Sequence, residues 1–201
     1  MELMISPASP YVRKARVAIR ELNLMDVVKE TEVTATIIGD PTDALLAANP
    51  TGKIPTLTRP DGPAIYDSRV ITRFLNDHAA GALYPEARLW EVLTLEATAD
   101  GMMDAAVNMA YEVRFRSEDM VYDDWLEGQW RKVTRSLLAI ESRWLSHLSG
   151  PLDMAQIAVG CVLAYLDLRH DARHWRALAP NLAAWEAEFS KRPSMQETKP
   201  A

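Results

Sequence analysis

The sequence predicts an α/β sandwich of about 80 residues followed by an all-helical region, with the boundary near residues 79–85. Two observations carry this prediction. Eight of the twelve prolines lie in the first 85 residues, and none lies between Pro85 and Pro151. All six tryptophans follow Pro85. Because proline lacks a backbone N–H and interrupts helices, we expect short elements and turns first and long helices later.

The first region alternates between strand-like and helix-like segments. Residues 2–5 form a short apolar strand, and residues 27–33 are a candidate second strand. Residues 11–24 carry apolar side chains at helical spacing, and four basic residues lie off that apolar stripe: Arg13, Lys14, Arg16 and Arg20. The other expected elements are a helix over 43–48, a β-hairpin from 54–58 and 64–66, and a helix that opens at Asp67 and Ser68.

The second region is expected to be helical throughout. The predicted helices span 86–115, 118–147, 154–168 and 182–192. Asp153 and Gln156 have the spacing of a capping box at the start of the third helix. That helix is almost wholly apolar, which predicts the buried centre of a bundle. The polar tail to Ala201 is expected to wrap or fray.

Composition excludes several classes of protein. A net charge of −6 makes nucleic acid an unexpected partner, because affinity for phosphate depends on basic patches. No apolar run reaches the roughly 18–20 residues of a membrane span, and the N-terminal residues do not resemble a signal peptide. The single cysteine, Cys161, cannot form an internal disulfide. We therefore expect a cytoplasmic protein.

A strand-to-helix turn at residues 6–14 is the first candidate site. Pro10 suits the first position of a helix, which makes Ser9 an N-cap candidate. Capping alone explains this serine. A hydroxyl at a helix N-terminus also offers a donor beside free N–H groups and the positive end of the helix dipole, so it can bind an anion. Ser6 is a second hydroxyl nearby, and the sequence does not decide between the two.

Residues 49–57 form the second candidate site. Pro55 stands where a strand should begin, either simply to initiate it or as a cis proline that exposes the backbone of Ile54 to a peptide ligand. Lys53 is able to hold a carboxylate, although such lysines are usually solvated.

Two further features lie at predicted helix ends. Asp67 or Ser68 caps the helix that follows the hairpin, and the same pair can bind an ammonium and a carboxylate, respectively. His170 and His174 have a spacing used by metal ligands on helices. No adjacent glutamate or nearby third ligand accompanies them, so we expect a surface position and no metal site.

The three sites together resemble the cytosolic glutathione transferases. The similarity rests on S-P-Y-V-R-K-A-R-V, N-P-T-G-K-I-P-T-L, the D-S pair before a helix, and L-x-x-A-D-G-x-x-D-A in the helical half. It covers nearly the whole chain and is strongest to short bacterial members with a Ser-Pro-Phe/Tyr turn. One departure is the capping sequence Asp153-Met154-Ala155-Gln156, where many members have Ser/Thr-x-x-Asp.

The resemblance implies the glutathione transferase fold, in which an α/β thioredoxin-like N-terminal domain (1–80) precedes an all-α C-terminal helical bundle (86–201). It implies glutathione as co-substrate, a homodimer and a role in detoxification. The matching positions assign Ser9 to the glutathione sulfur, and Ile54 with the cis Pro55 to the cysteinyl backbone. Lys53 matches a basic residue near the glycyl carboxylate, and Asp67 with Ser68 matches the pair at the γ-glutamyl end.

The implied reaction is attack by the glutathione thiolate on a small apolar electrophile. Ser9, with the backbone N–H groups of Tyr11 and Val12, is expected to stabilise the thiolate without a general base. The electrophile is expected between the domains, where the candidate lining residues are Tyr11, Met103, Val107, Tyr111 and Arg114. Bundle core is the alternative role for the methionines and Val107. Methionine-rich walls adapt to varied apolar ligands.

Other functions remain open on the sequence. A thiol–disulfide oxidoreductase needs a cysteine at position 9, where this chain has serine. A glutathione-dependent isomerase and a non-catalytic interaction protein of the same fold are the two rivals. The candidate groups for a dimer interface are Arg69, Arg73, Asp100 and Asp104.

Overall fold

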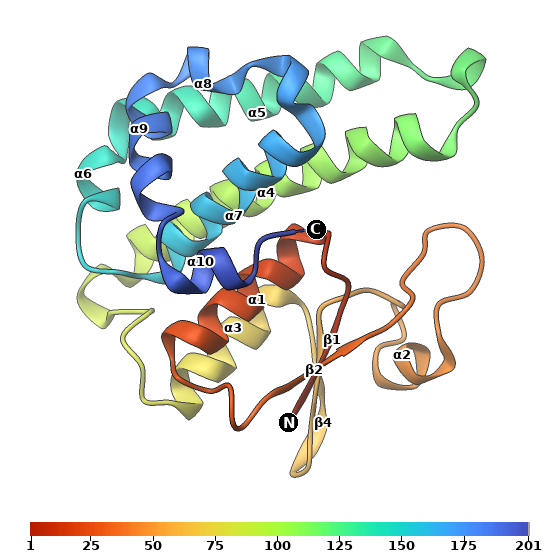
Figure 1. Ribbon diagram of the computed structural model, residues 1–201, viewed down its shortest axis with the longest axis vertical. Coiled ribbons are helices and arrows are strands. Elements are labelled where there is room, and N and C mark those ends of the chain that lie inside the picture. The colour runs from red at the N-terminus through yellow and green to blue at the C-terminus, as the bar shows by residue number, and fades with distance from the viewer. Residues whose placement is uncertain (201) are drawn as a thin grey trace. The chain divides into compact units, whose positions relative to one another are not determined.

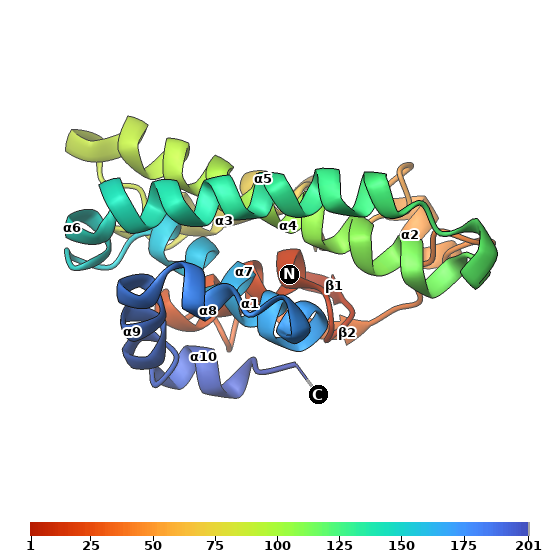
Figure 2. The same ribbon diagram turned by 90° about the horizontal axis from the view of Figure 1, so that it is seen from above.

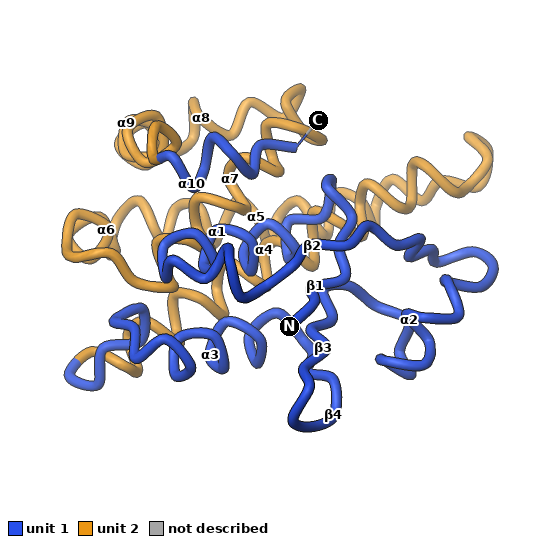
Figure 3. Tube along the Cα trace, turned by 60° about the horizontal axis from the view of Figure 1, so that its bottom comes forward, with its two compact units in different colours: residues 1–87, 193–201 blue, residues 88–192 orange. Residues whose placement is uncertain are grey.

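The computed structural model describes residues 1–200, which form two compact units (Figure 3). The first unit consists of residues 1–87 together with the C-terminal segment that begins at Pro193. The second unit consists of residues 88–192. The C-terminal segment thus belongs to the first unit, whereas the sequence predicted it as part of the helical domain.

The first unit is a four-stranded mixed sheet with helices on both sides (Figure 1). Its sheet order is β2-β1-β3-β4, with β1 parallel to β2 and antiparallel to β3, and β3 antiparallel to β4. Helices α1 and α3 pack side by side on one face, and α2 lies on the other side. The elements are β1 (Glu2–Ile5), α1 (Pro10–Glu21), β2 (Lys29–Glu32), α2 (Asp43–Ala48), β3 (Thr56–Arg59), β4 (Gly62–Ile65), α3 (Ser68–His78) and α10 (Pro193–Glu197).

The core of this unit joins the sheet to α1 and α3. Leu3 and Leu57 from the two central strands are fully buried against side chains of both helices, including Val12, Ile19 and Ile71. The alternation that the sequence predicted therefore forms a single apolar layer between sheet and helices.

The burial of helix α1 differs from the prediction for two of its basic residues. Arg13 and Lys14 lie off the apolar stripe in sequence, yet Arg13 is only 4% exposed and Lys14 is fully buried. The segment around α10 covers Arg13, because the Arg13 guanidinium donates hydrogen bonds to Met195 and Thr198. The polar tail thus folds onto the basic side of α1, which a pattern of residues along one helix does not reveal.

The second unit is helical, as predicted. Its long helices α4 and α5 run alongside each other, and α7 packs against α4 (Figure 2). The elements are α4 (Leu89–Phe115), η2 (Glu118–Met120), α5 (Asp123–Arg143), α6 (Leu145–Leu148), α7 (Met154–His170), η3 (Asp171–Arg173), α8 (Trp175–Leu178) and α9 (Pro180–Phe189), and a short turn η1 (Glu86–Arg88) precedes α4.

The apolar helix α7 forms the buried centre of this unit. Residues 154–163 are all buried. The predicted capping box is confirmed, since Gln156 N–H donates to Asp153 Oδ1 over 3.2 Å and Asp153 N–H donates to Gln156 Oε1 over 2.8 Å. Two orphan donors at the helix start are thereby satisfied reciprocally.

The helix predicted over 118–147 is divided into shorter pieces. Val121 and Tyr122 have extended backbones, and α5 begins only at Asp123. β-branched and aromatic residues are weaker helix formers, and the carboxylates of Asp123 and Asp124 favour a helix N-terminus at that point. Within residues 1–200, no helix has both the length and the hydropathy that a membrane span requires.

Candidate functional site

Three of the predicted sites follow or precede neighbouring strands at one end of the sheet. Met4 near the end of β1 pairs with Thr56 at the start of β3, and Leu57 pairs with Ile65 at the end of β4. Because these pairs are antiparallel, the residues after β1, before β3 and after β4 emerge at the same end. The strand register therefore places the turn that contains Ser9, the loop that contains Pro55 and the turn that contains Asp67 at the same end of the sheet.

Ser9 is the N-cap of α1. Its backbone is extended, and its Oγ accepts a hydrogen bond of 3.3 Å from the N–H of Val12. The half-buried hydroxyl keeps its own proton to donate. The Val12 N–H was expected to stabilise a thiolate directly. In the structure this N–H is engaged by Ser9, so its direct contact with a thiolate stays a prediction.

The loop of residues 49–56 is held by a side chain that sequence reasoning overlooked. Asn49 is 1% exposed, and its Nδ2 donates to the carbonyl of Lys53 over 3.0 Å and to Thr56 Oγ1 over 3.1 Å. Its Oδ1 accepts from the N–H and the hydroxyl of Thr51. An asparagine two residues before a Thr-Gly turn was the available signal, because asparagine side chains commonly bond their own turn.

Gly52 permits this loop to turn tightly. Its φ is +63°, and a Cβ at this position would lie 2.9 Å from Pro41 Cγ. Both the backbone conformation and the close approach favour glycine. Downstream of the turn, the Ile54–Pro55 peptide bond is cis. Lys53 is exposed and Ile54 is half-buried.

Asp67 is the N-cap of α3. Its Oδ1 accepts from the N–H of Arg69 over 3.0 Å, and its Oδ2 lies 3.2 Å from Arg69 Nη2. The carboxylate is 57% exposed and so remains accessible to a ligand. Ser68 follows as the first residue of α3 and is 3% exposed. Of the two capping candidates, the structure assigns the cap to Asp67.

The predicted electrophile-lining residues come from both units. Tyr11 lies in the first turn of α1, and the others lie on α4. Met103 is fully buried, Val107 and Tyr111 are half-buried, and Arg114 is exposed.

Tyr165 on α7 lies near two of these positions and was not singled out in the sequence. Burial raises the pKa of Tyr165 to about 12, an effect that Arg169 and Arg114 oppose and that Tyr111 reinforces. The phenol therefore stays protonated at physiological pH and remains able to donate a hydrogen bond.

His170 is half-buried and His174 is exposed, so only His174 has the surface position that the sequence predicted. Nε2 of His170 lies 2.8 Å from the carbonyl oxygen of Ala106, and His174 is exposed. Burial lowers the pKa of His170, against the effect of the Ala106 carbonyl and with the help of Arg173 and Arg169. Within residues 1–200, no three potential ligand side chains gather as a metal ion requires.

Comparison with known proteins places this arrangement in a family. The family model of the glutathione S-transferase N-terminal domain matches residues 3–82, and that of the glutathione S-transferase C-terminal domain matches residues 123–188. The chain therefore belongs to the glutathione S-transferase family, and the predicted fold class is confirmed.

Individual relatives agree with this assignment. A glutathione transferase family member from Pseudomonas fluorescens Pf-5, crystallised with bound glutathione, is 40% identical with a TM-score of 0.96, over 100% of this chain and 98% of that one. A glutathione S-transferase from Methylobacillus flagellatus KT with glutathione bound is 35% identical with a TM-score of 0.86, over 100% and 99% of the chains. The uncharacterized GST-like protein YibF of Escherichia coli (strain K12) is 29% identical, over 100% and 98%.

Proposed function

We propose that this protein is a glutathione S-transferase that joins the glutathione sulfur to small apolar electrophiles. The observation that carries the proposal is the convergence, at one end of the sheet, of the Ser9 cap, the cis Pro55 loop and the Asp67 cap. The relatives crystallised with glutathione support the same ligand for this chain.

Each part of the site would hold one part of glutathione. The backbone of Ile54 before Pro55 would pair with the cysteinyl residue, as an added strand pairs with a sheet edge. Asp67 would receive the γ-glutamyl ammonium, and the N-terminus of α3 at Ser68 would receive the γ-glutamyl carboxylate. Lys53 would hold the glycyl carboxylate as a point charge.

Ser9 would stabilise the thiolate by donating its hydroxyl proton as a hydrogen bond. A free thiol has a pKa of about 8.5, so only about 3% is ionised at pH 7. A decrease of about 2 units requires about 2.7 kcal/mol in favour of the anion. One hydrogen bond to a charged group supplies about 1.5–3 kcal/mol and a helix N-terminus about 0.3–1 kcal/mol.

The reaction then needs no further base. The thiol proton passes to water on binding, the sulfur electron pair forms a C–S bond, and the leaving group departs with its own pair. For an activated double bond, the resulting carbanion takes a proton from water. A Pseudomonas fluorescens Pf-5 family member, 39% identical with a TM-score of 0.92, was crystallised with S-(propanoic acid)-glutathione. That ligand is a glutathione thioether, which favours conjugation over isomerisation.

The electrophile would contact Tyr11 and the α4 residues Met103, Val107, Tyr111 and Arg114. We further propose a cytoplasmic, detoxifying homodimer, with Arg73, Asp100 and Asp104 as candidate interface groups. Among the four candidate groups, Arg69 bonds to Asp67 within its own chain and Asp100 is only 5% exposed, so these two are the weaker candidates. Sedimentation at micromolar concentration tests the dimer, and a single species of 22.5 kDa would refute it.

Glutathione binding is the first test of the function. Isothermal titration should give saturable binding that weakens in Asp67→Ala, and mass spectrometry of reactions with an electrophile panel should detect the conjugate. A product of unchanged mass with glutathione regenerated would identify the isomerase instead. No binding up to several millimolar glutathione would favour the interaction protein.

Ser9→Cys gives an independent test of where the sulfur lies. A cysteine at this position should gain thiol-transferase activity with glutathione mixed disulfides, because its thiolate can attack the disulfide sulfur and release glutathione. A variant that binds glutathione but stays inert would place the sulfur elsewhere, with Ser6 as the next candidate.

A further inference from the structure

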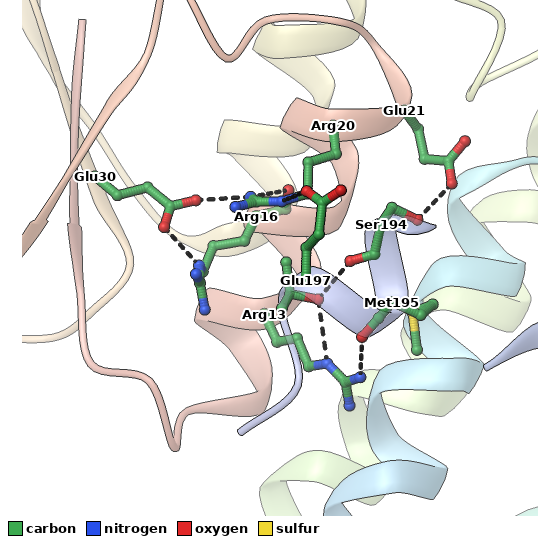
Figure 4. Close-up of polar contacts among 9 residues, drawn as sticks. Arg13, Arg16, Arg20, Glu21, Glu30, Ser194, Met195 and Glu197 are labelled. Carbon is green, nitrogen blue, oxygen red and sulfur yellow. Dashed lines mark hydrogen bonds and ion pairs between the residues drawn. The ribbon is translucent and has the colours of Figure 1, made fainter. Parts of the chain in front are cut away.

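Arg13 is a buried cation with neutral partners. Its Nη2 donates to the carbonyl of Met195 over 2.9 Å, and its Nε donates to Thr198 Oγ1 over 3.4 Å (Figure 4). Its Nη1 is buried and has no hydrogen-bond partner. The whole residue is 4% exposed, and within residues 1–200 it forms no ion pair with a carboxylate.

The other arginines on α1 are arranged differently. Arg16 lies 2.8 Å from Glu30, and Arg20 is 2.8 Å from Glu30 and 3.1 Å from Glu197. Their charges are thus compensated within the protein. Burying a charge without a counter-charge is costly, so an uncompensated guanidinium indicates that an anion belongs near it in the functional state.

The position of Arg13 points to the N-terminus of α1 as the place of that anion. Arg13 lies one helical turn beyond Ser9, and its N–H donates to the Ser9 carbonyl over 3.0 Å. Helical side chains incline toward the N-terminus of their helix. Figure 4 shows the polar contacts between α1, Glu30 and the C-terminal segment, and in it the Arg13 guanidinium lies on the opposite side from Arg20 and Glu21. Residues 10–13 include no acidic side chain to neutralise it.

The C-terminal segment keeps the guanidinium in this place. Thr198 is fully buried, accepts from Arg13 and donates to the carbonyl of Ser194 over 2.7 Å. Ser194 in turn donates its hydroxyl proton to Glu21 Oε1 over 2.5 Å at the far end of α1. Segment 193–198 is therefore attached along the length of the helix, with the Arg13 contact nearest to Ser9.

We infer that Arg13 is a positioning residue of the proposed thiolate site, and that segment 193–198 holds its charge beside the first turn of α1. This inference rests on the proposed function. When glutathione binds, its S–H bond breaks, the proton goes to water and the sulfur keeps the electron pair. The Arg13 charge favours the anion, so it lowers the pKa of the bound thiol without touching the substrate.

The size of the effect follows from Coulomb's law. For charges roughly 10 Å apart at an effective dielectric constant of about 20–40, removal of one charge shifts the thiol pKa by about 0.6–1.2 units. The direction is upward, because loss of a positive charge disfavours the thiolate.

The test is a titration of the bound thiol by the ultraviolet absorbance of its thiolate, with glutathione at saturation for each variant. Arg13→Met should raise the pKa of the bound thiol by about 0.6–1.2 units above the wild-type value. Arg13→Lys keeps the positive charge, so its thiol pKa should stay close to that of wild type. The matched control is Arg16→Met on the same helix, whose charge Glu30 already neutralises, and its thiol pKa should stay within about 0.3 units of wild type. The pH profile of kcat/KM should shift in parallel.

Thr198→Val tests the holding role without removing the charge. It deletes the acceptor of Arg13 Nε at nearly constant volume, so the guanidinium is less fixed and the thiol pKa should rise by at least about 0.3 units. If circular dichroism shows that Arg13→Met does not fold, the thiol pKa of Thr198→Val alone supports or refutes the inference.

The outcomes separate the two proposals. A wild-type protein that binds no glutathione refutes the proposed function and this inference with it. A wild-type protein with a lowered thiol pKa that Arg13→Met or Thr198→Val leaves unchanged refutes the inference alone. An equal rise in Arg13→Met and Arg16→Met also refutes it, since the effect would then follow the overall charge of the helix.

Discussion

The N-termini of α1 and α7 are both capped by a side chain, but the two caps are used differently. Ser9 is half-buried and accepts one hydrogen bond of 3.3 Å, which leaves its proton available. Asp153 is fully buried, and its Oδ1 accepts from Gln156. Asp153 Oδ2 lies 2.8 Å from His147 Nε2 and 3.7 Å from Arg88 Nη2.

The difference separates a structural cap, at Asp153, from the cap that we propose as functional, at Ser9. Asp153 Oδ1 accepts from Gln156 and its Oδ2 faces His147 and Arg88, so side chains of the protein itself surround this buried cap and the positive end of α7 serves folding. At Ser9 the helix dipole and a free hydroxyl donor would act on the thiolate that we propose to bind there, with the charge of Arg13 in support. Stability should therefore depend on Asp153, and activity on Ser9.

Removal of the structural cap at Asp153 should give the largest effect, which is a loss of stability. Asp153→Ala deletes the cap and leaves His147 and Arg88 without their carboxylate, so the free energy of unfolding should fall by about 3–4 kcal/mol. Chemical denaturation followed by circular dichroism measures it. Asp153→Asn is the matched control, since asparagine caps equally well and isolates the part due to charge. A loss below 1 kcal/mol in Asp153→Ala would contradict the structural role.

Removal of the functional cap should change activity more than stability. Ser9→Ala should lower kcat/KM for conjugation by about 10- to 100-fold, the value of one hydrogen bond to a charged group. The free energy of unfolding should fall by only about 0.5–1 kcal/mol. Ser6→Ala is the control, and steady-state kinetics compares the two. If Ser6→Ala caused the larger loss of kcat/KM, the thiolate donor would be Ser6.

Asp67 combines both kinds of cap, and two substitutions separate them. Asp67→Asn keeps an acceptor for the Arg69 N–H but loses the charge for the glutathione ammonium, so the Kd should rise about 3- to 10-fold with unchanged stability. Asp67→Ala should show the same loss of affinity and about 1 kcal/mol less stability. Calorimetric titration and denaturation together measure both quantities. Unchanged affinity in both variants would exclude Asp67 from the ligand site.

The smallest effect on stability is expected at a third helix N-terminus, that of α9, when its capping carboxylate is removed. Glu141 on α5 accepts from the N–H groups of Asn181 and Leu182. Burial raises the pKa of Glu141, but these hydrogen bonds outweigh it and lower the pKa below 4.5. Because the folded pKa is lower than the unfolded one, the stabilisation is complete above pH 4.5 and is lost as pH falls through the folded pKa.

Glu141→Gln tests this pH dependence. The variant should be less stable than wild type by about 0.3–1 kcal/mol at pH 7, and the difference should vanish in acid. Denaturation at a series of pH values measures it. A difference that stays constant from pH 7 into acid would mean that the charge of Glu141 contributes nothing.

Local patterns predicted the elements well where one signal governed them. The helix over 43–48, the capping box at Asp153 and the burial of residues 154–163 agree with the structure, whereas Leu168 at the end of the predicted apolar helix is 39% exposed. The division of 118–147 did not follow from periodicity, because its apolar spacing continues while Val121 and Tyr122 leave the helix. Asn49 was also missed, since its role depends on the three-dimensional path of the loop that it holds.

The sequence by itself determined the fold class, the three turns that carry Ser9, Pro55 and Asp67, and the resemblance to one family, because caps, prolines and turn residues act over a few positions along the chain. Only the tertiary structure decided that these turns meet at one end of the sheet, since strand register relates residues that are distant in sequence. It also decided that Arg13 is buried. No pattern within α1 contains the residues near Met195 and Thr198 that cover its guanidinium.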